Sequence, residues 1–139
     1  SYQPDMITLK DITALVHSSK TIDIFNLVDA FANRNPAKFQ ELLYRTLHDG
    51  TDPYYILTML IYQTRNLLSA RDLLDRKSSA SDLSKLLGLH PFVARKTFSQ
   101  ARQSSLGEFH KQYQALATLE QRAKQGNAHL TDQLFLLLV

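Results

Sequence analysis

Apolar residues recur every three to four positions along most of the chain, a spacing that places them on one face of an α-helix. The stretch after Pro53 keeps this spacing longest and predicts a helix of about 24 residues. No segment alternates apolar and polar residues as a half-buried strand would. The expected inward-facing residues after Pro36 and Pro53 are Phe39, Leu42, Leu43, Leu47, Leu57, Leu60, Ile61, Thr64, Leu67, Leu68 and Leu74. Those of two later helices are Leu83, Leu86 and Leu87, and Leu106, Phe109, Tyr113, Leu116 and Ala123.

Proline, glycine and small polar residues mark the ends of these helices. A capping residue followed by a first-turn proline, whose missing N–H is not needed there, occurs at Asn35-Pro36, Asp52-Pro53 and His90-Pro91. Glycines that suit a left-handed helix end follow apolar stretches at 50, 88 and 126. Capping-box spacing occurs at Thr8–Asp11, Ser79–Asp82 and Ser105–Glu108. The fold class we predict is all-α, a compact domain of about seven or eight helices joined by short loops.

A change of composition near the start predicts a boundary. The stretch from Val16 to Thr21 is small and polar, and it divides a short helix over roughly 8–16 from a body that starts near Ile22. A single short helix cannot bury its own apolar face. We therefore expect the first twenty residues to end a preceding domain. The first residue is Ser1 rather than Met, and the last residues lie in the apolar run Leu134–Val139, so we expect a piece of a longer protein. That run is expected to be a buried last helix.

Composition excludes several classes of site. The 139 residues contain no cysteine, which excludes disulfides, thiolate metal sites and cysteine nucleophiles. The longest apolar run is far shorter than the roughly twenty residues of a membrane-spanning helix. With no signal-peptide pattern at the start, we expect a soluble, cytoplasmic protein without membrane contact. The net charge of +3 lies towards the C-terminal half, which suits an ordinary helix surface, nucleic acid or an acidic partner.

The sequence shows no catalytic or cofactor motif. Four scattered glycines cannot form a phosphate-binding loop, and the five histidines lack metal-ligand spacing, so we expect cap or surface roles for them. Asp72 and Asp75 share one helix face with arginines at 65, 71 and 76, which indicates surface ion pairs rather than an acid–base pair. We expect no catalytic residue, no metal and no cofactor.

Residues 79–102 are similar to a helix-turn-helix, with Gly88 in the turn. The second helix carries Arg95 and Lys96, and Arg102 follows, so these three are the candidate DNA contacts of that reading. Ala94 speaks against it, because a bulky Val or Ile usually locks the two helices at that position. A DNA-binding regulator therefore stands as the alternative function.

An ordered set of segments resembles a known family. Leu87 to Lys96, followed by Gln100-Ala101-Arg102 and Ser105-Leu106, is similar to the C-terminal region of the delta subunit of the bacterial DNA polymerase III clamp loader. The segment Ile24 to Ala30 resembles the start of that family's last domain. Gly50 to Pro53 resembles the segment that precedes that family's long central helix. Gln63 to Leu68 resembles the core of the helix itself. The resemblance spans about residues 7–139.

This resemblance implies a function in DNA replication. Family members consist of an AAA+-like module that binds and opens the sliding clamp, a small helical lid and a helical collar that assembles the subunits into a ring. Residues 1–20 would be the end of the lid, and 21–139 the collar, or oligomerisation, domain. The implied partners are gamma/tau and delta-prime type subunits; contact with the clamp would need the N-terminal module, and contact with DNA would be indirect. The whole protein would then be a subunit of the DNA-directed DNA polymerase III holoenzyme, a nucleotidyltransferase, in the bacterial cytoplasm.

Residue roles remain separate hypotheses. We interpret Gly88 as a helix end, His90 and Pro91 as a helix start, and Phe92 as a core residue. Gln63 and Arg65 are expected either to bond between helices of the domain or to contact a neighbouring subunit. Aromatic residues and methionine are enriched at interfaces. The candidate subunit interface is therefore Tyr54, Tyr55, Met59, Tyr62, Gln63 and Arg65, although neighbouring helices of the same domain could equally cover this strip.

Overall fold

A computed structural model describes residues 9–126 and 129–139, and it describes side chains from residue 19 onward. Within that part of the chain there are seven α-helices, one short 3₁₀ turn and no strand, as the all-α prediction requires. The helices are α1 (Leu9–Ala32), α2 (Pro36–His48), α3 (Pro53–Asp75), α4 (Ala80–Leu87), α5 (Pro91–Gln100), α6 (Leu106–Lys124) and α7 (Leu130–Phe135). The 3₁₀ turn, η1, spans Ala101–Gln103. No helix among the described residues is long and apolar enough to cross a membrane.

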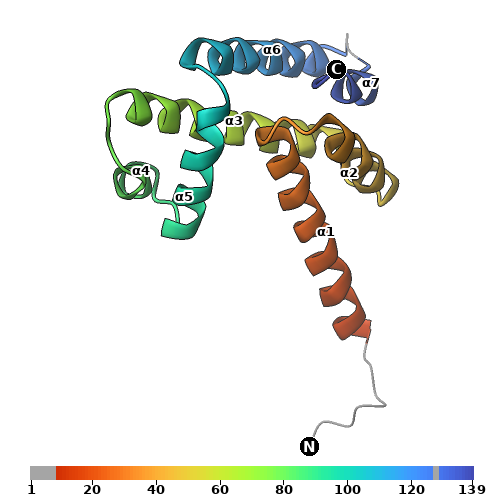
Figure 1. The fold of residues 1–139 in the computed structure, drawn as a ribbon. Helices are drawn as coiled ribbons and strands as arrows, with labels where there is room; N and C mark the ends of the chain where they lie inside the picture. The colour runs from red at the N-terminus through yellow and green to blue at the C-terminus, as the bar shows by residue number, and fades with distance from the viewer. Residues whose placement is uncertain (1–8, 127–128) are drawn as a thin grey trace, which may run out of the picture.

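Helix α3 is the centre of the fold. It packs against α1, α4, α5, α6, α7 and the 3₁₀ turn, while α1 and α2 form one pair beside it and α4 and α5 another. Figure 1 shows α3 running behind α5 and α1, with α6 above it and α1 projecting away from the body. Two groups of buried residues result. The first lies among α1, α2, the start of α3, the end of α6, and α7, and the second among the last residue of α1, the end of α3, α4, α5, η1 and the start of α6.

Local sequence sets the helix ends much as predicted. Asn35 Oδ1 accepts from the Lys38 N–H at 3.2 Å and Asp52 Oδ1 from the Tyr54 N–H at 2.9 Å, with Pro36 and Pro53 as the first helical residues. A capping box forms at Ser79–Asp82. At Ser105–Glu108 the Ser105 hydroxyl accepts from the Glu108 N–H, whereas the cap expected at Thr8 lies outside the described residues. Gly88 ends α4 in the left-handed region, with φ +66°, where a residue with a Cβ is strained.

The predicted break between residues 16 and 21 is wrong. One helix, α1, runs from Leu9 to Ala32 without interruption. The stretch contains serine and threonine but no proline or glycine. Serine and threonine lower helix propensity only slightly, so a short polar stretch does not by itself end a helix.

The prediction for the last residues is wrong in part. Helix α7 begins at Leu130 and ends at Phe135, so it contains only the start of the apolar run from Leu134 to Val139. Leu134 is fully buried, while Leu136 and Val139 are exposed. Beyond Phe135 the chain leaves the helix, and leucines 137 and 138 pack only partly against the first core group.

Most of the expected inward-facing residues are buried or partly buried. In α3 the stripe from Leu57 to Leu67 is buried as expected. Two leucines are exceptions, since Leu86 is exposed at the end of α4 and Leu106 is partly exposed at the first position of α6. Both lie in the terminal turn of their helix, where fewer neighbouring elements are available to cover a side chain.

Candidate functional site

The six α3 residues predicted as an interface do not share one surface. Tyr54 donates its hydroxyl hydrogen to the Ala123 carbonyl oxygen on α6. Arg65 Nε donates to the Tyr113 hydroxyl oxygen at 3.4 Å, and its guanidinium lies 5.8 Å from the centre of that ring. Tyr54 and Arg65 therefore serve the contact between α3 and α6 within the domain.

Gln63 belongs to a hydrogen-bond network that joins three helices. Its side chain is only 7% exposed, and its Nε2 donates to Gln100 Oε1 on α5 at 2.9 Å. Gln100 Nε2 in turn donates to Asp29 Oδ1 on α1 at 3.2 Å. Lys96 Nζ donates to the second oxygen of the same carboxylate at 3.0 Å, which completes the network. Gln63 thus forms the helix-to-helix bond that was one of its two predicted roles.

Tyr55, Met59 and Tyr62 lie on the side of α3 that faces α1. Met59, Tyr62 and Gln63 line a groove with Phe25 of α1 and with residues of α5. Tyr55 lines a smaller depression beside Ile24. Tyr55 and Tyr62 are both exposed, so this side of α3 presents aromatic surface that the domain itself does not cover.

Phe25 also belongs to this surface, and sequence reasoning missed it. The buried residues of α1 follow the helical pattern Ile24, Leu27, Val28 and Phe31, and Phe25 falls outside that stripe. A large aromatic residue off the buried stripe was a signal that the sequence already contained. Ile22, three residues earlier, is exposed as well.

The turn between α4 and α5 ends one helix and starts the next, as predicted. The prediction for Phe92 is the exception. His90 Nδ1 accepts from the Phe92 N–H at 3.1 Å, and Pro91 is the first residue of α5, as expected for a helix start. Phe92, predicted as a core residue, is 60% exposed. Ala94 faces inward on α5. Phe92 lies two positions earlier, which is just over half a helical turn, so its side chain faces away from that inward side.

The candidate DNA contacts are not free to act together. Lys96 is held by Asp29, and the Arg102 guanidinium lies 5.9 Å from the centre of the Phe98 ring. The Arg95 side chain has no hydrogen bond, ion pair or ring contact within the described part of the chain. Ala94 is fully buried where α4 and α5 pack, and the Ser84 hydroxyl donates to the Leu89 carbonyl oxygen across the turn. The packing explains this motif without DNA.

The charged helix surfaces form the expected ion pairs. Arg71 pairs with Asp75 at 2.6 Å and Arg76 with Asp72 at 3.3 Å, while Arg65 contacts Tyr113 instead. Hydrogen bonds from the backbone and side chain of Ser79 hold the pKa of Asp82 below its ordinary value, which is the effect of a helix cap. Among the described residues, no three His, Asp or Glu side chains gather as a metal site would require.

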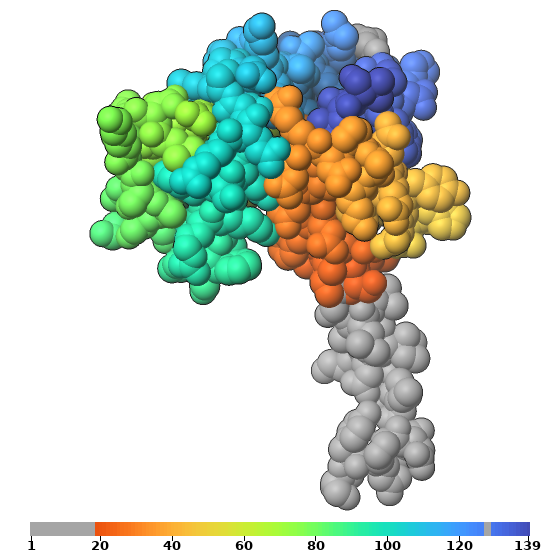
Figure 2. All heavy atoms as spheres, viewed as in Figure 1, coloured from red at the N-terminus to blue at the C-terminus, as the bar shows by residue number. Residues whose placement is uncertain are grey.

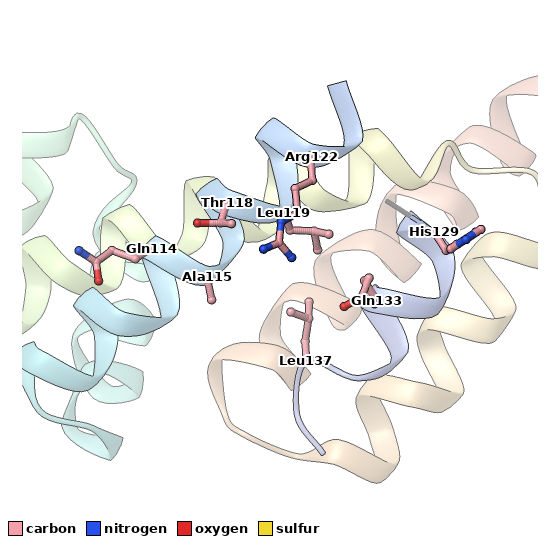
Figure 3. Close-up of a pocket in the computed structure, with 8 residues that line it drawn as sticks. All are labelled: Gln114, Ala115, Thr118, Leu119, Arg122, His129, Gln133 and Leu137. Atoms are coloured by element: carbon pink, nitrogen blue, oxygen red, sulfur yellow. The ribbon is translucent and has the colours of Figure 1, made fainter. Parts of the chain in front are cut away.

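A second cavity lies between α6 and α7. It has a volume of about 450 Å³ and is lined by Gln114, Ala115, Thr118, Leu119, Arg122, His129, Gln133 and Leu137. Figure 3 shows Leu137 pointing up between the two helices, while Gln114 and His129 project away from the centre. Arg122 points from α6 towards this space, but Gln114 and His129 do not join it there, and among the described lining residues no nucleophile lies beside a base.

Comparisons with known proteins identify the family. Residues 21–139 match the family model described as DNA polymerase III delta subunit, C-terminal domain. The chain is 28% identical over 133 residues to DNA polymerase III subunit delta of Bacillus subtilis (strain 168), covering 94% of this chain and 38% of that protein.

A solved structure shows the same relationship. The Bacillus subtilis DNA clamp loader delta protein matches with a TM-score of 0.76 and 26% identity, covering 95% of this chain and 40% of that one. This chain therefore spans less than half the length of both relatives. Neither comparison gives support to the helix-turn-helix regulator. The chain belongs to the family formed by the C-terminal domains of DNA polymerase III delta subunits.

Proposed function

We propose that this chain is the assembly region of a clamp-loader delta subunit, which takes part in DNA replication by helping to load the sliding clamp onto DNA. The observation that carries the proposal is the family match over residues 21–139. The structural similarity to a DNA clamp loader delta protein, which extends over 95% of this chain, supports it further. The exposed aromatic surface on α1 and α3 suits a domain that associates with other proteins.

The proposed division of the chain is a lid end at residues 1–20 and a collar domain at 21–139. The family match begins at residue 21, which supports this division. Because α1 runs from Leu9 to Ala32, the two parts would share one continuous helix rather than a flexible linker. This shared helix would then fix the orientation of the lid relative to the collar.

The proposed partners are gamma/tau and delta-prime type subunits, which would meet the collar in a ring. Contact with the sliding clamp would belong to an N-terminal module outside this sequence, and contact with DNA would be indirect. The role of this region is structural, and nucleotidyl transfer would be an activity of the assembled holoenzyme. The site of action would be the bacterial cytoplasm.

Deletion of the collar in the full-length protein tests the proposal. We expect the full-length protein to associate with purified partner subunits in size-exclusion chromatography, and a version without residues 21–139 to lose stable association. Binding of that shortened version to the sliding clamp is the control, because clamp contact would lie elsewhere. Normal assembly without residues 21–139 would contradict the proposal.

A further inference from the structure

A groove with a basic rim runs along the exposed side of α6. The cavity of about 450 Å³ between α6 and α7 shares Ala115 and Leu137 with a second cavity of about 380 Å³, so the two adjoin and form one α6 groove. The second cavity extends to the end of α1 and the last residues of the chain. The space-filling view shows the orange end of α1 and the dark blue end of the chain against the blue helix α6 (Figure 2).

One face of α6 forms a wall of the α6 groove. Four exposed residues of the helix line it: Lys111, Ala115, Thr118 and Arg122. Their spacing of four, three and four positions places them on one side of the helix. Lys111 and Arg122 are eleven positions apart, which corresponds to about 16 Å along the helix axis. The α6 groove therefore has a cation towards each end.

Three cations line the α6 groove, and none of them has a partner within the domain. The side chains of Arg34, Lys111 and Arg122 form no hydrogen bond, ion pair or ring contact in the described part of the chain. Figure 3 shows Arg122 pointing from α6 towards the space beside α7. No Asp or Glu side chain is among the described residues that line either cavity.

The carboxylates nearby do not neutralise these cations. Glu108 lies one turn before Lys111, but it accepts a hydrogen bond from the Ser105 hydroxyl at the start of α6. Asp132 of α7 lines neither cavity. The carboxylate of Val139 forms no ion pair with any described residue. The rim of the groove is thus left positive, and an acidic occupant would complement it in charge.

The rest of the lining favours a protein segment over a nucleic acid. Proteins that bind single-stranded nucleic acid combine a basic groove with aromatic side chains on which bases stack. Among the described lining residues the only Phe, Tyr or Trp is Phe31, whose side chain is 1% exposed. Between the cations the lining contains Ala115, Leu119 and Leu137 instead. Such an apolar floor suits aliphatic side chains.

We propose that the α6 groove binds an extended acidic segment of a partner protein. An extended chain advances about 3.3 Å per residue, so about six residues reach past both end cations. Carboxylates at one end of the segment pair with Arg122, and those at the other end pair with Lys111 and Arg34. Aliphatic side chains in its middle cover the apolar floor. This inference goes beyond the proposed function and does not depend on it.

The test measures binding of a synthetic peptide to the full-length protein by fluorescence anisotropy. The peptide is a labelled hexapeptide with aspartates at both ends and leucines in the middle. We expect Arg122→Glu to weaken binding at least about tenfold, because attraction at a central contact becomes repulsion. Arg95→Glu is the matched control, since Arg95 is also exposed and unpaired but lines neither cavity. Equal affinities of the two variants, or no binding to the wild type at millimolar concentration, would overturn the proposal.

Arg34→Gly gives the sharpest readout, because it separates binding from stability. Arg34 has φ +53°, in the left-handed region where a residue with a Cβ is strained. Glycine relieves that strain, so we expect the melting temperature of the full-length protein to be kept or raised while peptide binding weakens. Lys77→Gly is the matched control, since Lys77 is also basic, has φ +59° and lines neither cavity. Equal peptide affinities of the two glycine variants would contradict the proposal.

Altered probes identify the chemistry of the occupant. Replacing the aspartates of the peptide by asparagine, or its leucines by serine, should weaken binding, because the first removes the ion pairs and the second the apolar contact. Unchanged binding of either peptide would show that the occupant is not an acidic segment with aliphatic residues. If a thymidine oligonucleotide binds more tightly and loses affinity in Arg122→Glu, the groove is a nucleic-acid site and the proposal is wrong. A homodimer that Arg122→Glu dissociates in sedimentation would likewise replace the partner protein by a second copy.

Discussion

The two core groups differ in how they hold their helices together. The first contains large side chains such as Phe31, Phe39 and Leu57, and only two of its seventeen buried members are alanines. Half of the second consists of alanines, at positions 32, 70, 94 and 101. Small residues let helices approach closely, whereas large ones fill the space between helices that lie further apart. The first group is therefore sensitive to lost volume and the second to added volume.

Buried polar residues on α3 separate the two groups. Ile61 is the last α3 residue of the first group and Leu67 the first of the second. Between them Gln63, Thr64 and Asn66 are buried, and Gln63 begins the network to α5 and α1. The two groups are thus joined by directional hydrogen bonds as well as by the backbone of α3, and these bonds fix one relative placement of the helices.

Loss of volume in the first group should have the largest effect. Phe39 is fully buried and its ring packs 5.5 Å from that of Phe31. We expect Phe39→Ala to lower the free energy of unfolding by about 3–5 kcal/mol, measured by urea denaturation. Tyr44→Ala, on the same helix but exposed, should cost far less. Equal losses from both variants would show that α2 is not packed through Phe39.

Added volume in the second group should have the next largest effect. Ala94 is fully buried where α5 packs against α4. We expect Ala94→Leu to lower the free energy of unfolding by about 1–3 kcal/mol, because the helices must move apart. Arg95→Leu, the neighbouring exposed position, is the control. A stabilised Ala94→Leu variant would mean that the second group contains unfilled space.

Removal of the network between the groups should cost less. Gln63→Leu removes the hydrogen donor to Gln100 Oε1 while keeping a similar volume. We expect a loss of about 1 kcal/mol in the free energy of unfolding, because a buried acceptor loses its partner. Gln121→Leu on the exposed side of α6 should leave it nearly unchanged. No difference between the two variants would show that the network does not stabilise the junction.

The smallest effect should come from the α4 cap and depend on pH. Because Ser79 lowers the pKa of Asp82 in the folded protein, the carboxylate contributes stability above its ordinary pKa, and that contribution is lost as pH falls through the lowered value. We expect Asp82→Asn to have a slightly lower melting temperature than the wild type at neutral pH, with the difference shrinking as the solution becomes acidic. A difference independent of pH would contradict this role of the charge.

The sequence by itself determined the class of fold, most of the helix ends and the family. These depend on local rules: Asn35-Pro36 starts a helix and Gly88 ends one because the interacting groups lie within a few residues of each other. The ordered segments that resemble the delta family also lie within short windows, and the family match agrees with them.

The tertiary structure decided which side of each helix is covered. Leu86 fits the helical pattern of α4 and Phe92 is predicted as a core residue, yet both are exposed. The bond from Gln100 to Asp29 joins residues 71 positions apart, and the groove beside Phe25 forms only where α1, α3 and α5 meet. Periodicity predicts which face of a helix is apolar. Only the packing of distant helices determines whether that face is buried in the core, hydrogen-bonded to another helix or exposed to solvent.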